Sequence, residues 1–218
     1  MADLNLLYQA VLGGKRDEAK AQTAAAMAAQ VPVAQILQSL IDAMAAIGHK
    51  FQCKDAFVPE MLMSARAMKE AMALLEPSLV KAGIRPEHKA VIGTVQGDLH
   101  DIGKNLVAMM WKGANFEVID LGINVSASKF ASAVQQHKPA VVGLSALLTT
   151  TMPAMEQAVA AIKATGVACQ IVCGGAPVTA EYTKKIGADG YASDATRAVE
   201  LVRGLCGTRL DVSSGVAV

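Results

Sequence analysis

Residues 89–122 have the sequence KAVIGTVQGDLHDIGKNLVAMMWKGANFEVIDLG, in which a β-rich run, a loop, a helical pattern and a second β-rich run follow one another. Three more β-rich runs come later, PAVVGLSA at 139–146, CQIVCGG at 169–175 and DGYAS at 189–193. The helical patterns lie near 102–113, 126–137, 152–165, 177–186 and 194–205. This alternation predicts an α/β fold with a five-stranded parallel sheet and helices on both faces. Ligands bind such sheets beyond the carboxyl ends of the strands.

The N-terminal part of the chain shows helical spacing of apolar residues instead. One stripe follows Pro32 and ends at Phe51, and a second occupies residues 61–79. With shorter helical patterns near 3–12 and 15–30, these stripes predict a four-helix bundle. The methionine-rich second stripe is compatible with core packing or with an adaptable surface that faces a bulky ligand.

Gly83 and Pro86 interrupt the helical pattern within LVKAGIRPEH, residues 79–88. We therefore expect a helical domain at residues 1–83 and an α/β domain at 88–206. The last segment, GTRLDVSSGVAV at 207–218, is weakly patterned, and we expect a flexible tail.

Composition excludes several classes of protein. The 20 basic and 19 acidic residues are nearly balanced, so the chain has no charge signature of nucleic-acid or membrane-surface binding. No apolar run approaches the roughly 20 residues that cross a bilayer, and no basic segment precedes an apolar one at the N-terminus, so we expect a cytoplasmic protein. The four cysteines include no C-x-x-C pair, and Cys169 and Cys173 lie on a predicted buried strand, which disfavours a metal role.

The loop after the first strand, GDLHDIGKN at 97–105, carries the first chemical signal. It matches neither G-x-G-x-x-G nor a P-loop, and Asp98 and Asp101 would repel a phosphate, which disfavours a dinucleotide site. In an extended segment Asp98 and His100 point the same way, so the carboxylate can orient one ring nitrogen while the other faces outward. This arrangement is typical of a metal-ligating histidine, although the same pair also occurs in ordinary loops.

Two other strand ends add to this signal. The third strand ends in SALLT, with Ser145 and Thr149 where large aliphatic residues are usual. The fourth ends in Gly174, Gly175 and Ala176, where small side chains let a ligand approach the backbone.

Together these elements resemble the cobalamin-binding signature of the methionine synthase and methylmalonyl-CoA mutase families, D-x-H-x-x-G, then S-x-L, then G-G. The intervals also fit, with 41 residues between Gly103 and Ser145 and 26 between Leu147 and Gly174. The helical half, including FVPEMLMSA at 57–65, extends the resemblance to the small corrinoid proteins of methanogen and acetogen methyltransferase systems. Those proteins pair a helical cap with a flavodoxin-like corrinoid domain.

The resemblance implies a role for each matched residue. His100 would ligate cobalt from the lower face, in place of the dimethylbenzimidazole base of the cofactor, with Asp98 on its second nitrogen. Thr151 stands where the family often has a serine that extends this relay. The displaced nucleotide tail would enter a slot between the sheet and its helices, and the helical cap would shield the upper face. The other residues expected at the cofactor are Gly97, Leu99, Asp101, Ile102, Gly103, Ser145, Leu147, Thr149, Gly174, Gly175, Ala176, Tyr191, Ala192, Ser193 and Met61.

The function implied by the resemblance is that of a corrinoid methyl carrier, which cycles between Co(I) and methyl-Co(III). Its partners would be a substrate:corrinoid methyltransferase, a corrinoid:tetrahydrofolate or corrinoid:thiol methyltransferase, and a reductive activase. The chain would be a component of the system and not a complete enzyme. The methyl donor is not specified by the sequence.

Two alternatives use the same cofactor motif. A cobalamin-dependent sensor needs a DNA-binding head, but residues 1–82 show no evident helix-turn-helix or basic face. A mutase small subunit is disfavoured by the helical cap. A signalling receiver is excluded, because the third strand ends in Ser145 where a phosphoacceptor aspartate is required.

Overall fold

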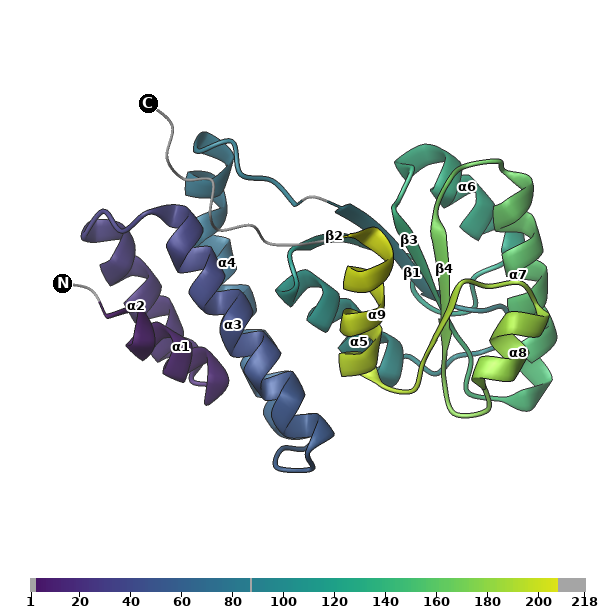
Figure 1. Ribbon diagram of the computed structural model, residues 1–218, viewed down its shortest axis with the longest axis horizontal. Helices are drawn as coiled ribbons and strands as arrows, with labels where there is room; N and C mark the ends of the chain where they lie inside the picture. The colour runs from purple at the N-terminus through teal and green to yellow at the C-terminus, as the bar shows by residue number, and fades with distance from the viewer. Residues whose placement is uncertain (1–2, 87, 208–218) are drawn as a thin grey trace.

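The four N-terminal helices form a bundle in the computed structural model, which describes residues 3–86 and 88–207 (Figure 1). They are α1 (Leu4–Leu12), α2 (Arg16–Ala28), α3 (Val33–Gln52) and α4 (Val58–Lys81). Helix α1 packs on α2 and α3, and α4 packs on the same two helices. The predicted helical character of the N-terminal part is therefore confirmed.

Local sequence explains where α4 begins and what it buries. Glu60 accepts a hydrogen bond from the backbone N–H of Phe57 at 3.0 Å, and Pro59 occupies the first turn, where it costs no hydrogen bond. The side chains of Met61 and Leu75 are fully buried. The stripe at 61–79 thus packs in the core of the bundle.

The second part of the chain alternates strands with helices. The strands are β1 (His88–Thr94), β2 (Phe116–Asp120), β3 (Val141–Ser145), β4 (Gln170–Gly174) and β5 (Gly190–Ala192). The helices are α5 (Ile102–Gly113), α6 (Ala127–His137), α7 (Met152–Ala164), α8 (Ala180–Lys185) and α9 (Ala195–Cys206), with a short 3-10 turn, Thr149–Thr151, before α7. All strand pairs are parallel, in the order β2-β1-β3-β4-β5. The predicted flavodoxin-like α/β fold with five parallel strands is confirmed.

Helix α8 is shorter than the predicted 177–186. Thr179 caps it, because its hydroxyl accepts a hydrogen bond from the N–H of Tyr182 at 3.1 Å. Residues 177–179 are therefore outside the helix. The predicted flexible tail after Gly207 lies outside the described residues.

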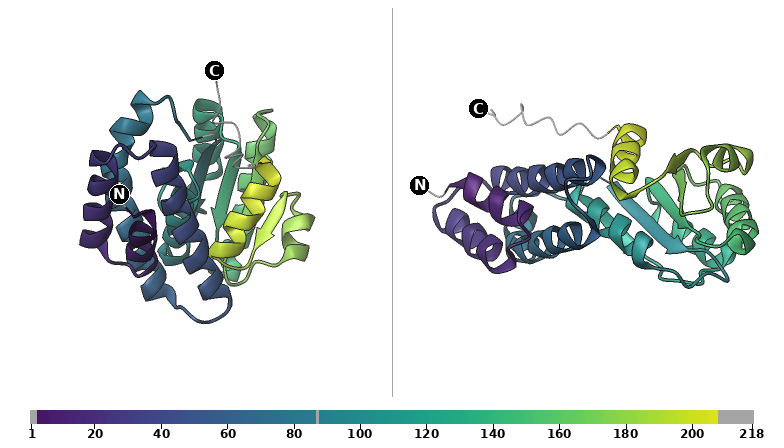
Figure 2. Two further views of the ribbon diagram at one scale, coloured as in Figure 1. Left: turned by 60° about the vertical axis from the view of Figure 1, so that its left-hand side comes forward. Right: turned by 90° about the horizontal axis from the view of Figure 1, so that it is seen from below.

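Helices cover both faces of the sheet (Figure 1). Helices α5 and α9 pack together on one face, and α6, α7 and α8 lie on the other. Figure 2 shows the N-terminal bundle on the side of the sheet that carries α5 and α9, and α3 and α4 contact these helices. One apolar core runs from the bundle through α5 and α9 to the sheet, and a second core fills the other face.

The connection between α4 and β1 contains the predicted boundary at residues 83–88. Since the bundle shares a continuous core with α5 and α9, the division into two independent domains stays a prediction. None of the helices in residues 3–86 and 88–207 is long and apolar enough to span a bilayer.

Candidate functional site

The loop after β1 places His100 and Asp98 at the carboxyl-end edge of the sheet. Asp98 is fully buried, whereas the His100 side chain is 51% exposed. The Nδ1 atom of His100 lies 2.8 Å from Oδ1 of Asp98, and the backbone N–H of His100 donates to the same oxygen at 3.0 Å. The contact expected from the spacing of the two residues is present. With Nδ1–H directed at the carboxylate, Nε2 carries the lone pair that a metal ion can bind.

The second oxygen of Asp98 connects the loop after β1 to the loop after β3. Oδ2 accepts hydrogen bonds from the N–H groups of Leu147 and Leu148, at 2.7 and 3.3 Å, and from the hydroxyl of Thr151 at 2.8 Å. Burial by itself raises the pKa of this carboxyl, but the hydrogen bonds from Leu147, His100 and Thr151 outweigh it and hold the pKa well below its ordinary value. Asp98 is therefore a carboxylate near neutral pH and fixes the orientation of the imidazole ring.

Thr94 and Asn124, which the sequence did not single out, hold the same loop. The hydroxyl of Thr94 donates to the carbonyl of His100 at 3.0 Å. The side-chain oxygen of Asn124 accepts from the N–H of Gly97 at 2.8 Å, and the N–H of Asn124 donates to the carbonyl of Asp98 at 3.0 Å. A hydroxyl at the end of an apolar strand was a weak signal for Thr94. The sequence contained no signal for Asn124, because its contacts join two loops that are distant in sequence.

An ion pair between a buried lysine and a partly exposed aspartate fixes the first turn of α5 to the end of β2. Lys104 is 4% exposed, and its Nζ lies 2.6 and 2.8 Å from the two carboxylate oxygens of Asp120. The N–H of Gly122 also donates to Asp120, at 2.9 Å. The sequence did not reveal this pair either, since a lysine in a helical pattern is usually solvated.

A slot lies between the sheet and helices α5 and α9, beside the His100 loop. It is a cavity of about 200 Å³, lined by residues of β1, β3, β4, β5, α5 and α9 and by Phe51 from the end of α3. Six of the residues predicted at the cofactor line it, namely Gly103, Ser145, Gly174, Gly175, Ala192 and Ser193. Lys104 and Trp111 also line the slot, and the sequence did not identify them.

The glycines of this region serve different purposes. A Cβ on Gly103 would meet nothing within 4 Å, so this first turn of α5 leaves open space beside the slot. Gly175 has φ of +124°, and a Cβ there would lie 1.8 Å from the carbonyl oxygen of Ala146. The expectation that Gly175 makes room for a ligand is therefore incomplete, because the close approach of the loops after β3 and β4 already requires glycine.

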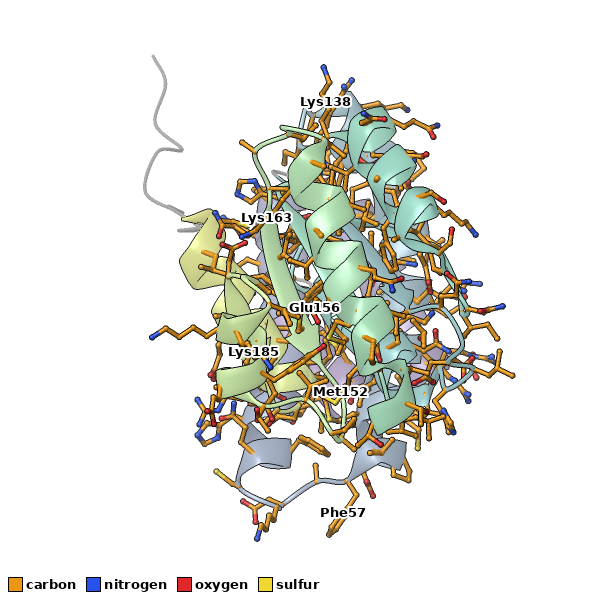
Figure 3. The ribbon with its side chains drawn as sticks, turned by 90° about the vertical axis from the view of Figure 1, so that its right-hand side faces the viewer. Phe57, Lys138, Met152, Glu156, Lys163 and Lys185 are labelled. Carbon is orange, nitrogen blue, oxygen red and sulfur yellow. The ribbon has the colours of Figure 1, made fainter. Side chains whose placement is uncertain are left out.

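Large apolar side chains are exposed on the loops after β1, β2 and β3 and at the start of α5. We call this surface the apolar rim; it consists of Leu99, Ile102, Ile123, Leu147 and Leu148, each between 42% and 74% exposed. Phe57, in the connection between α3 and α4, is 65% exposed, and in the view of Figure 3 it lies toward the lower edge, on the same side as Met152, the first residue of α7. An exposed apolar surface beside a half-exposed imidazole is typical of a ligand site.

Several predicted site residues are placed away from the slot. Tyr191 packs toward the opposite face of the sheet, because neighbouring residues of a strand alternate and Ala192 takes the slot side. Thr149, in the 3-10 turn before α7, and Ala176, on the loop after β4, are exposed and do not line the slot. Asp101 is also exposed, and it accepts a hydrogen bond from Asn105 at 3.0 Å.

Met61 is not at the site. Its side chain has no exposed surface and belongs to the core of the bundle, so it cannot contact a cofactor in this conformation. Met63, two residues later on α4, is 50% exposed. Helical periodicity located a buried stripe correctly, but it did not distinguish a core from a ligand-facing surface.

Comparisons with known proteins agree with this geometry. Residues 88–200 match a B12 binding domain, and residues 4–76 match a second family also described as a B12 binding domain. A corrinoid protein of Desulfitobacterium hafniense (strain Y51) is 35% identical over 213 residues, which cover 95% of this chain and 99% of that protein. Trimethylamine corrinoid protein 2 of Methanosarcina acetivorans is 38% identical over 194 residues, covering 86% of this chain and 89% of that protein.

A solved structure is similar over nearly the whole fold. The crystal structure of the methanol:cobalamin methyltransferase complex from Methanosarcina barkeri contains a chain with a TM-score of 0.84 and 27% identity. The similarity covers 94% of this chain and 80% of that chain. Both the helical bundle and the α/β part are thus included.

Proposed function

The chain belongs to the family of corrinoid proteins with B12 binding domains, and on this premise we propose that it carries a methyl group on a bound corrinoid. The observation that carries the proposal is the pair of a half-exposed His100 and a buried Asp98, 2.8 Å apart, beside the slot. A bound corrinoid supplies a cobalt ion that accepts a methyl group from one molecule and gives it to another.

The residues present fit such a cofactor. Nε2 of His100 is the atom that would hold the cobalt, and the exposed apolar rim would give the macrocycle an apolar surface to pack on. The slot of about 200 Å³ would receive the nucleotide tail, with open space at Gly103 and the hydroxyl of Ser145 near its mouth.

Asp98 holds the imidazole in place. Its carboxylate lies 2.8 Å from Nδ1 and accepts the N–H there, so Nε2 stays the atom that can bind a metal ion. Thr151 donates to the other oxygen of Asp98 and keeps the carboxylate aligned. We assign Thr151 to this relay as a positioning residue, since its hydroxyl occupies a place that a serine could also fill.

The bundle takes the role of a cap. Phe57 is exposed at the end of the molecule that carries the loops of the site, and an apolar side chain there would keep water from the reactive face. The partner must reach the same face, so the connection between α4 and β1 is the place where the cap would move.

The partners follow from the role. One relative is named for trimethylamine, and the solved neighbour is part of a methanol:cobalamin methyltransferase complex. We propose that a substrate-specific methyltransferase loads this chain and that a second methyltransferase, acting on tetrahydrofolate or a thiol, unloads it. A reductive activase would restore the protein after oxidation.

The experiment uses the protein loaded with cobalamin and chemically reduced. It is mixed with methyl iodide, a reactive methyl donor, or with methanol or trimethylamine, and methylation is followed by absorbance. We expect rapid methylation by methyl iodide and none by methanol or trimethylamine. Turnover of either natural donor without a partner contradicts the carrier role, and so does a loaded protein that methyl iodide cannot methylate.

A further inference from the structure

The sheet wall of the slot consists of two rows of side chains. The row at the mouth contains Ser145, Gly174 and Ala192, which register pairs place side by side. The deeper row contains Ile92, Gly143 and Val172, which are paired in the same way. Residues two apart on a strand are separated by about 6.6 Å, so the deeper row lies that far inside the mouth.

Aromatic and small apolar side chains form the opposite wall at this depth. Trp111 of α5 closes the slot, because a Cβ on Gly143 would lie 2.8 Å from its ring. The indole N–H of Trp111 already donates to the carbonyl of Ala198 at 3.3 Å. Val107 and Ala198 line the same wall.

The hydroxyl and charged side chains that line the slot lie at its mouth, whereas the side chain of Cys173 belongs to the core on the other face of the sheet. Ser145 and Ser193 carry hydroxyls at the mouth, and Lys104 is paired with Asp120. Asp194 caps α9 through hydrogen bonds from two backbone N–H groups. Within residues 3–86 and 88–207, the deeper row and its facing wall offer no free side-chain donor or acceptor.

The side chains of the slot change from polar at the mouth to apolar at depth. From this change we propose that the slot selects corrinoids by their lower base, and that it favours dimethylbenzimidazole over adenine. The inference rests on the proposed function, which places the nucleotide tail in the slot. The polar mouth suits the sugar and phosphate, and the apolar depth suits a flat base. Both bases share one imidazole nitrogen, but adenine adds further ring nitrogens and an amine.

The polar atoms of adenine are left unpaired beside Ile92, Val172 and Trp111. Burial of such atoms without hydrogen bonds weakens binding by about tenfold or more. Val172 is 4% exposed and faces the slot, so a threonine at this position adds a hydroxyl at the depth of the base. Val142 is a matched control, because it is fully buried on β3 and faces the other side of the sheet.

The test measures dissociation constants of the full-length protein for cobalamin, for the adeninyl cobamide and for cobinamide, which lacks the nucleotide. We expect cobalamin to bind about tenfold or more tightly than the adeninyl cobamide. Cobinamide should bind more weakly than cobalamin. Val172→Thr should reduce the preference for cobalamin, and Val142→Thr should leave it unchanged.

Each other outcome overturns the inference in an identifiable way. Equal affinity for cobalamin and the adeninyl cobamide removes the selectivity. Cobinamide binding as tightly as cobalamin means that the slot does not receive the base. An unchanged preference in a folded Val172→Thr contradicts the depth assigned to the base. If none of the three compounds binds, the proposed function itself fails, and the inference fails with it.

Discussion

The two faces of the sheet use alternate residues of the same strands, but one face is filled and the other contains the slot. The face under α6 and α7 presents large aliphatic and sulfur-containing side chains, Val91, Val142, Leu144, Ile171 and Cys173. The face under α5 and α9 presents Ile92, Gly143, Ser145, Val172, Gly174 and Ala192. The difference grows toward the carboxyl ends of the strands, where small residues replace large ones on one face only.

An aromatic ring packed over a glycine is common to both faces. Phe130 lies over Gly93 on the filled face, with 2.8 Å to a Cβ placed there, and Trp111 lies over Gly143 at the same distance on the slot face. Close packing in the middle of the sheet is therefore not what separates them. The slot exists because side chains are missing beyond Trp111, and a surface without packing partners forfeits dispersion contacts unless a ligand supplies them. On this ground, and without reference to any relative, we expect the ligand on the face that contains the slot.

Removal of Asp98 should have the largest effect, because this residue joins the loop that leads to α5 with the loop that leads to α7. We expect Asp98→Ala to lower the free energy of unfolding by about 3 kcal/mol, since several buried donors lose their acceptor. Urea unfolding measures the change. Asp101→Ala, an exposed neighbouring carboxylate, should cost no more than about 1 kcal/mol. If the two variants lose similar amounts of stability, the hydrogen bonds of Asp98 do not hold the loops after β1 and β3 together.

The same substitution on opposite faces of the sheet tests whether only one face has room for a ligand. Ala198→Leu places three additional carbons in the slot, and we expect cobalamin binding to weaken by about 100-fold, with little loss of stability. Ala158→Leu introduces the same group into the filled face and should destabilise the protein by about 1–3 kcal/mol. Calorimetric binding and thermal unfolding distinguish the two outcomes. If Ala198→Leu binds cobalamin as tightly as the native protein, the slot is not where the cofactor binds.

Acid should reveal the charge of Asp98. Because its pKa in the folded protein is lowered, the stability that it contributes is fully present above the unfolded pKa of about 3.9 and is lost as the pH falls below that value. The stability difference between the native protein and Asp98→Asn should therefore narrow between neutral pH and acid. Urea unfolding of both proteins at several pH values measures it. A difference that stays constant means that Asp98 is not held as a carboxylate.

Thr151 should give the smallest effect. Thr151→Val keeps the shape of the side chain but removes the hydroxyl from Asp98, and we expect a loss of about 1 kcal/mol. Thr151→Ser retains the hydroxyl and should restore the hydrogen bond. In the loaded protein, only the valine variant should change the pH dependence of the Co(II)/Co(I) potential. If Thr151→Ser behaves like Thr151→Val, the effect comes from packing and not from the hydrogen bond to Asp98.

Much of the fold was predictable because its signals are local. The helical pattern at 102–113 coincides with α5 (Ile102–Gly113), and each β-rich run became a strand. The contact of Asp98 with His100 followed from a spacing of two residues. The contacts of Thr94 and Asn124 could not be predicted, since they depend on loops that meet only after the sheet has formed.

The direction of individual side chains was the second feature that the sequence did not predict. Met61 and Tyr191 were assigned to the site from their place in a motif or stripe, but the helix buries one and strand alternation turns the other away from the slot. Gly175 was predicted to leave room for a ligand, and the structure shows that the position needs glycine for a different reason. That reason, the approach of the Ala146 carbonyl, depends on two loops that are distant in sequence.

Electron paramagnetic resonance of the Co(II) protein shows whether His100 coordinates the cobalt. The protein is prepared with nitrogen-15-labelled histidine and loaded with unlabelled cobalamin. A histidine nitrogen on cobalt must change the nitrogen splitting from a triplet to a doublet, and His100→Ala must abolish that doublet. A triplet that persists in the labelled protein shows that the base of the cofactor is still bound to cobalt, and His100 is then not the ligand.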